Sequence, residues 1–388
     1  MKVAVKIAGR RASAGRRRKT GAGQAVPAPL DAPGIARALL RWYGRARRDL
    51  PWRRCRDPYR VWVSEIMLQQ TQVERVKDFF VRFMERFPTV ASLAAAREDA
   101  ALKLWEGLGY YRRARQLHAA AKRVMDEFGG EFPGTAAALR ALPGIGRYTA
   151  GAIASIAFDQ PEPIVEANSR RVIARLVGHD GPLGGAAGDE PIWEAARAFV
   201  PRRHPGRFNQ ALMDLGAVVC TPNRPLCGTC PLAESCVARR DGRVDEIPRR
   251  AERRATKELR ETAVVASRAG RVLVVQRAAG EWWAGLWDFP RVPGRMARAA
   301  RGIAASPVLG SLGCGRPERR GTVVHTVTHH RITLDVVRCA ARRAGRRGAG
   351  RRWVTPRQLA ALALTSPARR IARLVVERRP ATAAAGAV

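Results

Sequence analysis

Four cysteines occur close together at a spacing of C-x6-C-x2-C-x5-C: Cys220, Cys227, Cys230 and Cys236. Four thiolates at this spacing hold either a metal centre or a pair of disulfides. The first 20 residues are basic without an apolar core, and no long apolar run that could span a membrane occurs. We therefore expect an intracellular protein with reduced thiols, which disfavours disulfides.

Zinc and an iron–sulfur cluster remain the candidates for this cysteine loop. Structural zinc sites usually have two short C-x2-4-C pairs, whereas this loop has one, Cys227 and Cys230, flanked by single cysteines. The spacing therefore favours a compact cluster wrapped by one loop, with zinc as the alternative. The other cysteines, Cys55, Cys314 and Cys339, are isolated in the sequence, and we expect them to be small buried residues.

The composition indicates a polyanionic partner. The chain has 388 residues, and its 71 Lys+Arg against 33 Asp+Glu give a net charge of +38. Nucleic acid is the first candidate and acidic lipid a distant second. A GC-rich genome can account for part of the arginine excess, but the acidic residues are not correspondingly raised. The length allows two domains.

Five segments differ in their residue pattern. Residues 1–30 form a basic arm that we expect to be disordered, either an extension without a role or a non-specific DNA tether. Residues 31–240 have apolar residues three and four apart, which predicts helices. A charged linker is expected over 241–260, a smaller α+β domain over 261–375 and a disordered tail over 376–388.

A second motif, LPGIGRYTAGA, occupies residues 142–152. Gly144 and Gly146 permit a tight turn with positive φ between two helices. The N–H groups of this turn and of the next helix start, with Arg147, would then face a DNA phosphate. The alternative is a helical corner with packing glycines only.

The helical region, this hairpin and the cysteine loop together resemble the endonuclease III superfamily of DNA base-excision glycosylases. Members that also act as lyases place a lysine after the position of Arg147. This chain has Tyr148 there. A phenol cannot form an imine with the sugar, so the resemblance implies a glycosylase without lyase activity.

Three segments narrow the resemblance: LPWRRCRDPYRVWVSEIMLQQTQVERV (50–76), WEGLGYYRRARQLHAAA (105–121) and FNQALMDLGAVVCTPNRPLC (208–227). They look like the MutY family, which removes adenine mispaired with 8-oxoguanine. The resemblance implies a mainly α, two-lobed helix-hairpin-helix domain with an iron–sulfur loop, plus a smaller α+β Nudix-like C-terminal domain. It also implies a structural [4Fe-4S] cluster and double-stranded DNA with adenine mispairs as partner. We expect a monomer without a membrane partner in a bacterial cytoplasm, associated with the nucleoid, with an organellar or nuclear address in the basic arm as the alternative.

Glu65 matches the family's catalytic glutamate, which protonates N7 of adenine. A general acid at neutral pH needs a raised pKa. The apolar neighbours Val63, Ile66 and Met67 are expected to desolvate it.

Three further residues match catalytic positions. Tyr148 matches a residue beside the sugar, and Asn168 matches an asparagine near the catalytic carboxylate. The family's second carboxylate is an aspartate in an LDGN context, but this chain has Glu166 followed by Ala167. Glutamate keeps the charge and adds about one ångström of reach, to which near-attack geometry is sensitive. We expect its role of stabilising an oxocarbenium-like state to survive.

The remaining matched positions contact bases. Those matching the adenine pocket are Arg48, Trp52, Arg53 and Gln210, and those matching the wedge beside the oxidised guanine are Gln70 and Tyr110.

In the C-terminal domain the family's Phe-Ser-His tip corresponds to Val327, Thr328 and His329. Thr328 keeps a hydroxyl and His329 keeps the ring, whereas Val327 cannot stack as Phe would. No Nudix pyrophosphatase box is present, so this domain is expected to bind and not to hydrolyse. Three alternatives remain: a mismatch glycosylase with altered base preference, such as one for thymine, a non-catalytic iron–sulfur DNA-damage-binding protein, and a zinc-dependent structural DNA binder.

Overall fold

The computed structural model describes residues 30–249, 255–294, 299–345, 348 and 350–375. The expected tail over 376–388 and the expected basic arm, apart from residue 30, lie outside this part of the chain. So do five residues of the expected linker, 250–254. None of the described helices is long and apolar enough to cross a membrane.

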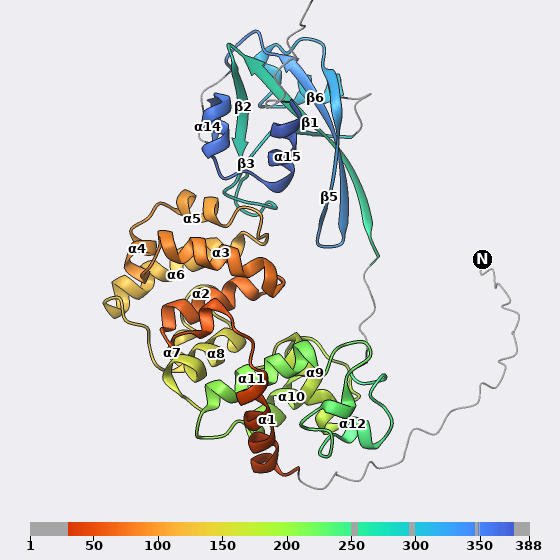
Figure 1. Ribbon diagram of the computed structural model, residues 1–388. Helices are drawn as coiled ribbons and strands as arrows, with labels where there is room; N and C mark the ends of the chain where they lie inside the picture. The colour runs from red at the N-terminus through yellow and green to blue at the C-terminus, as the bar shows by residue number, and fades with distance from the viewer. Residues whose placement is uncertain (1–29, 250–254, 295–298, 346–347, 349, 376–388) are drawn as a thin grey trace, which may run out of the picture.

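Helices build the first part of the chain (Figure 1). The helical elements are α1 (Ala32–Ala46), η1 (Pro51–Arg53), α2 (Pro58–Leu68), α3 (Val73–Arg86), α4 (Val90–Ala94), α5 (Glu98–Leu104), α6 (Arg112–Phe128), α7 (Ala136–Leu139), α8 (Arg147–Phe158), α9 (Ala167–Val177), α10 (Gly185–Phe199), α11 (Pro205–Val218), η2 (Cys227–Thr229) and α12 (Val237–Arg240).

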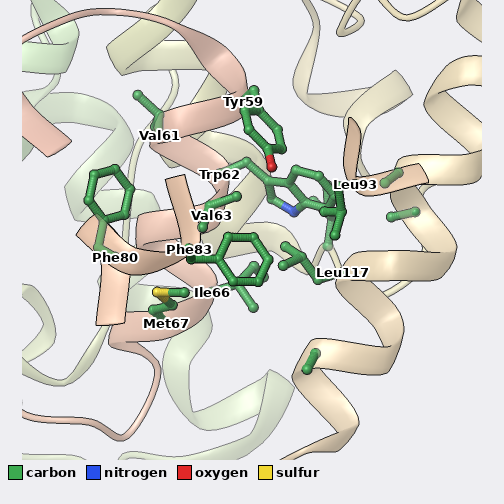
Figure 2. Packing of buried hydrophobic residues seen from close by; sticks show 14 of the residues in the cluster. Tyr59, Val61, Trp62, Val63, Ile66, Met67, Phe80, Phe83, Leu93 and Leu117 are labelled. Carbon is green, nitrogen blue, oxygen red and sulfur yellow. The ribbon is translucent and has the colours of Figure 1, made fainter. Parts of the chain in front are cut away.

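These helices form two lobes with separate cores. In the first lobe, α2–α8 surround an aromatic-rich core that includes Trp62, Phe83 and Trp105 (Figure 2). Phe83 and Trp105 meet edge to face at 6.2 Å between ring centroids, an arrangement that aromatic pairs favour. In the second lobe, α1 returns to pack against α10 and α11. Tyr148 contacts both cores, which places it between the lobes.

A seven-stranded sheet with flanking helices forms the second domain. Its elements are β1 (Lys257–Arg268), β2 (Arg271–Gln276), β3 (Trp287–Asp288), β4 (Arg291–Pro293), α13 (Ala299–Ala305), η4 (Gly310–Leu312), β5 (Glu318–Val327), β6 (His330–Ala340), β7 (Arg351–Val354), α14 (Pro356–Ala361) and α15 (Ser366–Val375). The strand order is β3-β2-β1-β6-β5, with β4 paired to β1 and β7 to β2. β1 and β6 are parallel, and the other pairs are antiparallel. The mainly α fold with a smaller α+β domain is confirmed.

Two hairpins contribute four of the strands of this sheet. β1 and β2 are joined by Ala269 and Gly270, both with positive φ, as a tight two-residue hairpin turn requires. β5 and β6 pair from Glu318 to the tip at Val327 and form a long hairpin that projects from the sheet (Figure 1). β1 begins at Lys257, inside the expected linker, because its first residues pair with the start of β6. Consecutive residues of β1 pack into different core clusters, so both faces of the sheet are covered.

A polar contact joins the two domains. The guanidinium of Arg369 on α15 donates to both oxygens of Glu106, at 2.6 and 2.9 Å. Lys103 Nζ lies 2.9 Å from Glu106 and also donates to the carbonyls of Ala360 and Leu362. Burial raises the pKa of Glu106, but hydrogen bonds from Arg369 and Lys103 outweigh it, so the net pKa is lowered.

Candidate active site

Glu65 lies on α2, whose start is specified locally. The Asp57 side chain accepts from Tyr59 N–H, and Pro58 occupies the first turn. The Glu65 carboxyl is 4 % exposed, and burial raises its pKa to about 7, although Tyr148 and Arg53 oppose the rise. A carboxyl group with this pKa is partly protonated at neutral pH and can act as a general acid.

Tyr148 holds the Glu65 carboxyl from the opposite lobe. Its hydroxyl donates to Glu65 Oε2 at 2.5 Å, and burial raises its own pKa well above the usual value. Tyr148 is the second residue of α8, directly after the predicted hairpin. In that hairpin only Gly144 has a positive φ, of 78°, whereas Gly146 is extended. The expected turn with positive φ is therefore present, and Gly144 supplies the positive φ.

Glu166 is the N-cap of α9. Its two carboxylate oxygens accept from the backbone N–H groups of Asn168 and Ser169, each at 2.8 Å, and the Ser169 hydroxyl accepts from Glu166 N–H. A helix N-terminus favours a negatively charged carboxylate. The pKa of Glu65 is raised further by Glu166, so two carboxyl groups of different character share the site.

Asn168 is oriented by the cysteine loop. Arg171 donates to Asn168 Oδ1 at 2.9 Å, to Gly216 O at 2.6 Å and to Cys220 O at 2.7 Å. The buried guanidinium of Arg171 therefore links Cys220, the first cysteine of the loop, to Asn168.

Asp214 on α11 fixes the two arginines expected in the adenine pocket. Its fully buried carboxylate accepts from Arg53 at 2.6 and 3.0 Å and from Arg48 Nε at 2.6 Å. On the same helix, Gln210 Oε1 accepts from Tyr43 at 2.7 Å. These bonds preset the polar wall of the pocket.

A cleft of about 710 Å³ between the lobes collects most of the predicted residues. Those that line it are Arg48, Trp52, Arg53, Glu65, Gln70, Gly144, Gly146, Arg147, Tyr148, Glu166, Asn168 and Gln210. Tyr110, Thr328, His329 and the four cysteines do not line it.

The two predicted wedge residues lie on turns that one arginine organises. Gln70 and Tyr110 both have positive φ, of 55° and 49°, which is strained for residues other than glycine. Arg113 donates to the carbonyls of Ile66, Met67 and Gln69 at the end of α2, and its guanidinium lies 5.4 Å from the Tyr110 ring. Tyr110 is 52 % exposed, so it is available to a base.

Arg147 is engaged in an ion pair. Its guanidinium donates to both oxygens of Glu190, at 2.7 and 3.2 Å, and lies 4.0 Å over the Trp193 ring. The backbone of the α8 start faces the cleft, but a phosphate contact by the Arg147 side chain requires exchange of the Glu190 carboxylate for the phosphate.

The β5–β6 tip carries an aromatic group. Thr328 has a positive φ of 53°, and its hydroxyl is 3.4 Å from Nδ1 of His329. The His330 ring lies 4.1 Å from His329 and 5.0 Å from Trp282, which is 37 % exposed. Trp282 and His330 thus add aromatic surface beside the position where Val327 replaces the family's Phe.

The four cysteines line one small cavity. Arg175 Nη1 donates to Cys220 Sγ at 3.3 Å. Burial raises the pKa of Cys230 to about 11. Among the described residues, no group of three or more His, Cys, Asp or Glu side chains could hold one metal ion.

The expectation for the isolated cysteines was partly wrong. Cys55 is exposed, whereas Cys339 is buried and its sulfur lies 2.9 Å from that of Cys314.

Comparison with known proteins identifies the class to which this fold and site belong. Residues 63–184 match the HhH-GPD superfamily base excision DNA repair proteins, and residues 262–374 match the NUDIX domain. The chain is 36 % identical over 402 residues to the adenine DNA glycosylase of Mus musculus, covering 89 % of this chain and 78 % of that protein. The human adenine DNA glycosylase is 34 % identical over 89 % of this chain and 74 % of its own length. The chain belongs to the adenine DNA glycosylase family.

A solved structure agrees in fold. A thermostable thymine-DNA glycosylase is similar at 29 % identity and a TM-score of 0.50, covering 54 % of this chain and 97 % of that one.

Sequence reasoning missed three residues that organise the site: Arg113, Asp214 and Glu190. One signal was available for Asp214, which is the only acidic residue of the otherwise largely apolar 205–218 segment. Nothing local marks Arg113 or Glu190 among the many charged residues of this chain, since their partners are distant in sequence.

Proposed function

We propose that this protein hydrolyses the N-glycosidic bond of adenine mispaired with 8-oxoguanine or guanine in double-stranded DNA and leaves an abasic site. One observation carries the proposal: a buried carboxyl with a pKa of about 7, Glu65, lies in the interlobe cleft beside a second, N-capping carboxylate, Glu166. Family membership supports adenine as the excised nucleobase, since the curated relatives are named adenine DNA glycosylases.

In the proposed mechanism the flipped adenine enters the cleft against Trp52 and the Arg48–Asp214–Arg53 wall. Protonated Glu65 donates to N7, which turns adenine into a neutral leaving group. Tyr148 holds the carboxyl in position and stabilises the carboxylate that forms.

Glu166 acts on the sugar. As the C1′–N9 bond breaks, positive charge develops on the sugar, and the carboxylate stabilises it. Water then adds at C1′, and its proton passes to the Glu65 carboxylate, which restores the acid. Tyr148 at the position of the lyases' lysine supports hydrolysis without strand cleavage.

The rest of the protein positions the DNA. The α8 start and the hairpin supply backbone N–H groups for phosphate. Gln70 and Tyr110 fill the space beside the flipped base and offset an unstacking cost of a few kcal/mol. Thr328 and His329 contact the opposite, oxidised base.

Cys220, Cys227, Cys230 and Cys236 would hold a [4Fe-4S] cluster, which orders the loop and contributes electrostatically to DNA binding. The brown absorbance of purified protein distinguishes this cluster from zinc.

The test is single-turnover excision from duplexes that hold adenine opposite 8-oxoguanine, guanine or cytosine, and thymine opposite guanine. We expect abasic sites with the first two, none with cytosine or thymine, and no strand break before alkali. Glu65→Gln serves as the inactive control. Absence of abasic sites from both adenine mispairs would refute the proposal, and excision of thymine alone would select the mismatch alternative.

A further inference from the structure

The C-terminal domain brings together two cysteines that are far apart in sequence. Cys314 follows η4, and Cys339 lies near the end of β6, yet their sulfurs are 2.9 Å apart. This separation is only roughly 0.9 Å longer than a disulfide bond. A small side-chain rotation would therefore allow bond formation.

The backbone around the pair is already aligned. Cys314 forms an antiparallel bridge with Ala341, and Gly315 N–H donates to Ala340 O at 3.0 Å. Cys339 is two residues before Ala341 in the extended strand, so both side chains enter the same core cluster, on the face covered by α13 and η4. The contact between the two sulfurs is therefore held by backbone pairing on both sides.

The two thiols are not equivalent. Cys339 is 2 % exposed, whereas Cys314 is half-buried and open to a small reagent. The Cys339 thiol donates to the Cys314 sulfur, which lowers the pKa of Cys314 and raises that of Cys339. Cys314 is therefore the attacking thiolate and Cys339 the resolving thiol.

The segment between the cysteines is the β5–β6 hairpin with Thr328 and His329 at its tip. β5 is the edge strand of the sheet, and its pairing with β6 is irregular between Arg319 and Gly321, close to the pair. An edge strand with an irregular base is where local opening requires least free energy. A covalent link at this point closes the base of the hairpin.

We propose that Cys314 and Cys339 are a dithiol–disulfide pair whose oxidation by a low-molecular-weight disulfide such as oxidised glutathione staples the base of the β5–β6 hairpin. The Cys314 thiolate attacks one glutathione sulfur and releases one glutathione thiolate. Cys339 then attacks the Cys314 sulfur and releases the second, and its proton passes to the departing thiolate. One glutathione disulfide is reduced to two thiols, and two protein thiols become one disulfide.

The first test is chemical and needs no DNA. The complete protein is equilibrated with oxidised glutathione, free thiols are alkylated, and peptides are identified by mass spectrometry. We expect a Cys314–Cys339 cross-linked pair lacking two hydrogens in wild type and in Cys55→Ser, and none in Cys314→Ser or Cys314→Ala. Two alkylated thiols, or a glutathione adduct that persists on Cys314, would overturn the proposal.

The second test measures the hairpin. Oxidation should slow amide hydrogen exchange in residues 318–340 by roughly tenfold in wild type and leave it unchanged in Cys314→Ser. If the cross-link forms but amide hydrogen exchange in residues 318–340 is unchanged, the proposal that the disulfide stabilises the hairpin is wrong.

A consequence for base discrimination rests on the proposed function: the ratio of adenine excision opposite 8-oxoguanine to that opposite guanine should change on oxidation in wild type but not in Cys314→Ser. If neither form excises adenine, the proposed function fails while the cross-link result stands.

Discussion

Among the residues of the cleft, Glu65 carries the proposed mechanism, which requires its carboxyl to be neutral when adenine binds and negative after the bond breaks. Burial favours the neutral carboxyl, and Tyr148 limits how far the pKa rises, to about 7. A proton donor tuned near the working pH transfers its proton most efficiently.

We expect single-turnover excision to decline above pH 7, about tenfold per unit, as Glu65 loses its proton. Glu65→Gln should abolish excision at every pH while retaining the hydrogen bond from Tyr148. A pH-rate profile without a decline between pH 7 and 9 would show that another group is the acid.

Glu65→Gln should also change the stability of the folded protein, by an amount that depends on pH. Because the folded-state pKa of Glu65 is raised from 4.5 to about 7, the unfolded chain loses this proton at lower pH than the folded protein does. Stability therefore falls between pH 4.5 and 7, by roughly 3 kcal/mol in all, and the loss stays constant above pH 7. Glu65→Gln should therefore raise the free energy of unfolding at pH 8 and leave it nearly unchanged at pH 4, where both forms are neutral. Denaturant unfolding at the two pH values measures this difference.

The Glu166 side chain caps the N-terminus of α9 and also supplies the negative charge of the proposed mechanism. Glu166→Gln loses the charge and one of two cap acceptors, so we expect excision to fall by about 100-fold or more and stability by about 1 kcal/mol. Glu166→Asp is the matched control, since it keeps the charge and is a good cap, and it should retain more activity than Gln. Full activity of Glu166→Gln would remove Glu166 from the site.

At the scale of elements, the position of Glu166 and Asn168 depends on how closely α11 approaches α9. A Cβ at Gly216 would lie 2.7 Å from Asn168 Cβ and 2.9 Å from its carbonyl oxygen. The glycine is required by this contact with Asn168, because Gly216 itself has no positive φ.

Gly216→Ala should therefore force the two helices apart, reduce stability by about 1–3 kcal/mol and lower the excision rate. Gly44→Ala, on the exposed side of α1 with nothing within 4 Å of its Cβ, is the control and should be neutral or stabilising by up to about 1 kcal/mol. Unfolding curves and single-turnover rates compare the two. Equal stability and equal excision rates of the two variants would show that the close approach of Gly216 to Asn168 is not required.

At the scale of the whole molecule, the sheet domain is attached to the helical domain partly through Glu106 and Arg369. Because the pKa of Glu106 is lowered in the folded protein, the contact contributes above the unfolded-state pKa and is lost as pH falls below the lowered value.

Glu106→Gln should loosen the docking, enlarge the radius of gyration in solution scattering and reduce discrimination of the opposite base more than excision itself. Glu127→Gln, which breaks a similar bidentate pair with Arg123 within one exposed helix, is the control and should change neither quantity. An unchanged scattering profile for Glu106→Gln would mean that the Glu106–Arg369 ion pair is not needed to hold the domains together.

Local patterns in the sequence indicated the helices, the α+β character of the second domain, the cysteine loop and the motif residues, because helical and strand periodicity and turn chemistry act between neighbours. The motifs identify Tyr148 and Glu65 separately as site residues. Their hydrogen bond, and the pKa it moderates, arises only when α8 and α2 meet across the lobes.

The tertiary structure alone decided which charges are paired and which thiols meet. Asp214 holds Arg48 and Arg53, Glu190 holds Arg147, and Cys314 reaches Cys339. Each contact joins residues many positions apart, and in a chain with so many arginines no local rule selects the partner. The physical reason is that burial and ion pairing depend on distance in space, which the path of the folded chain sets.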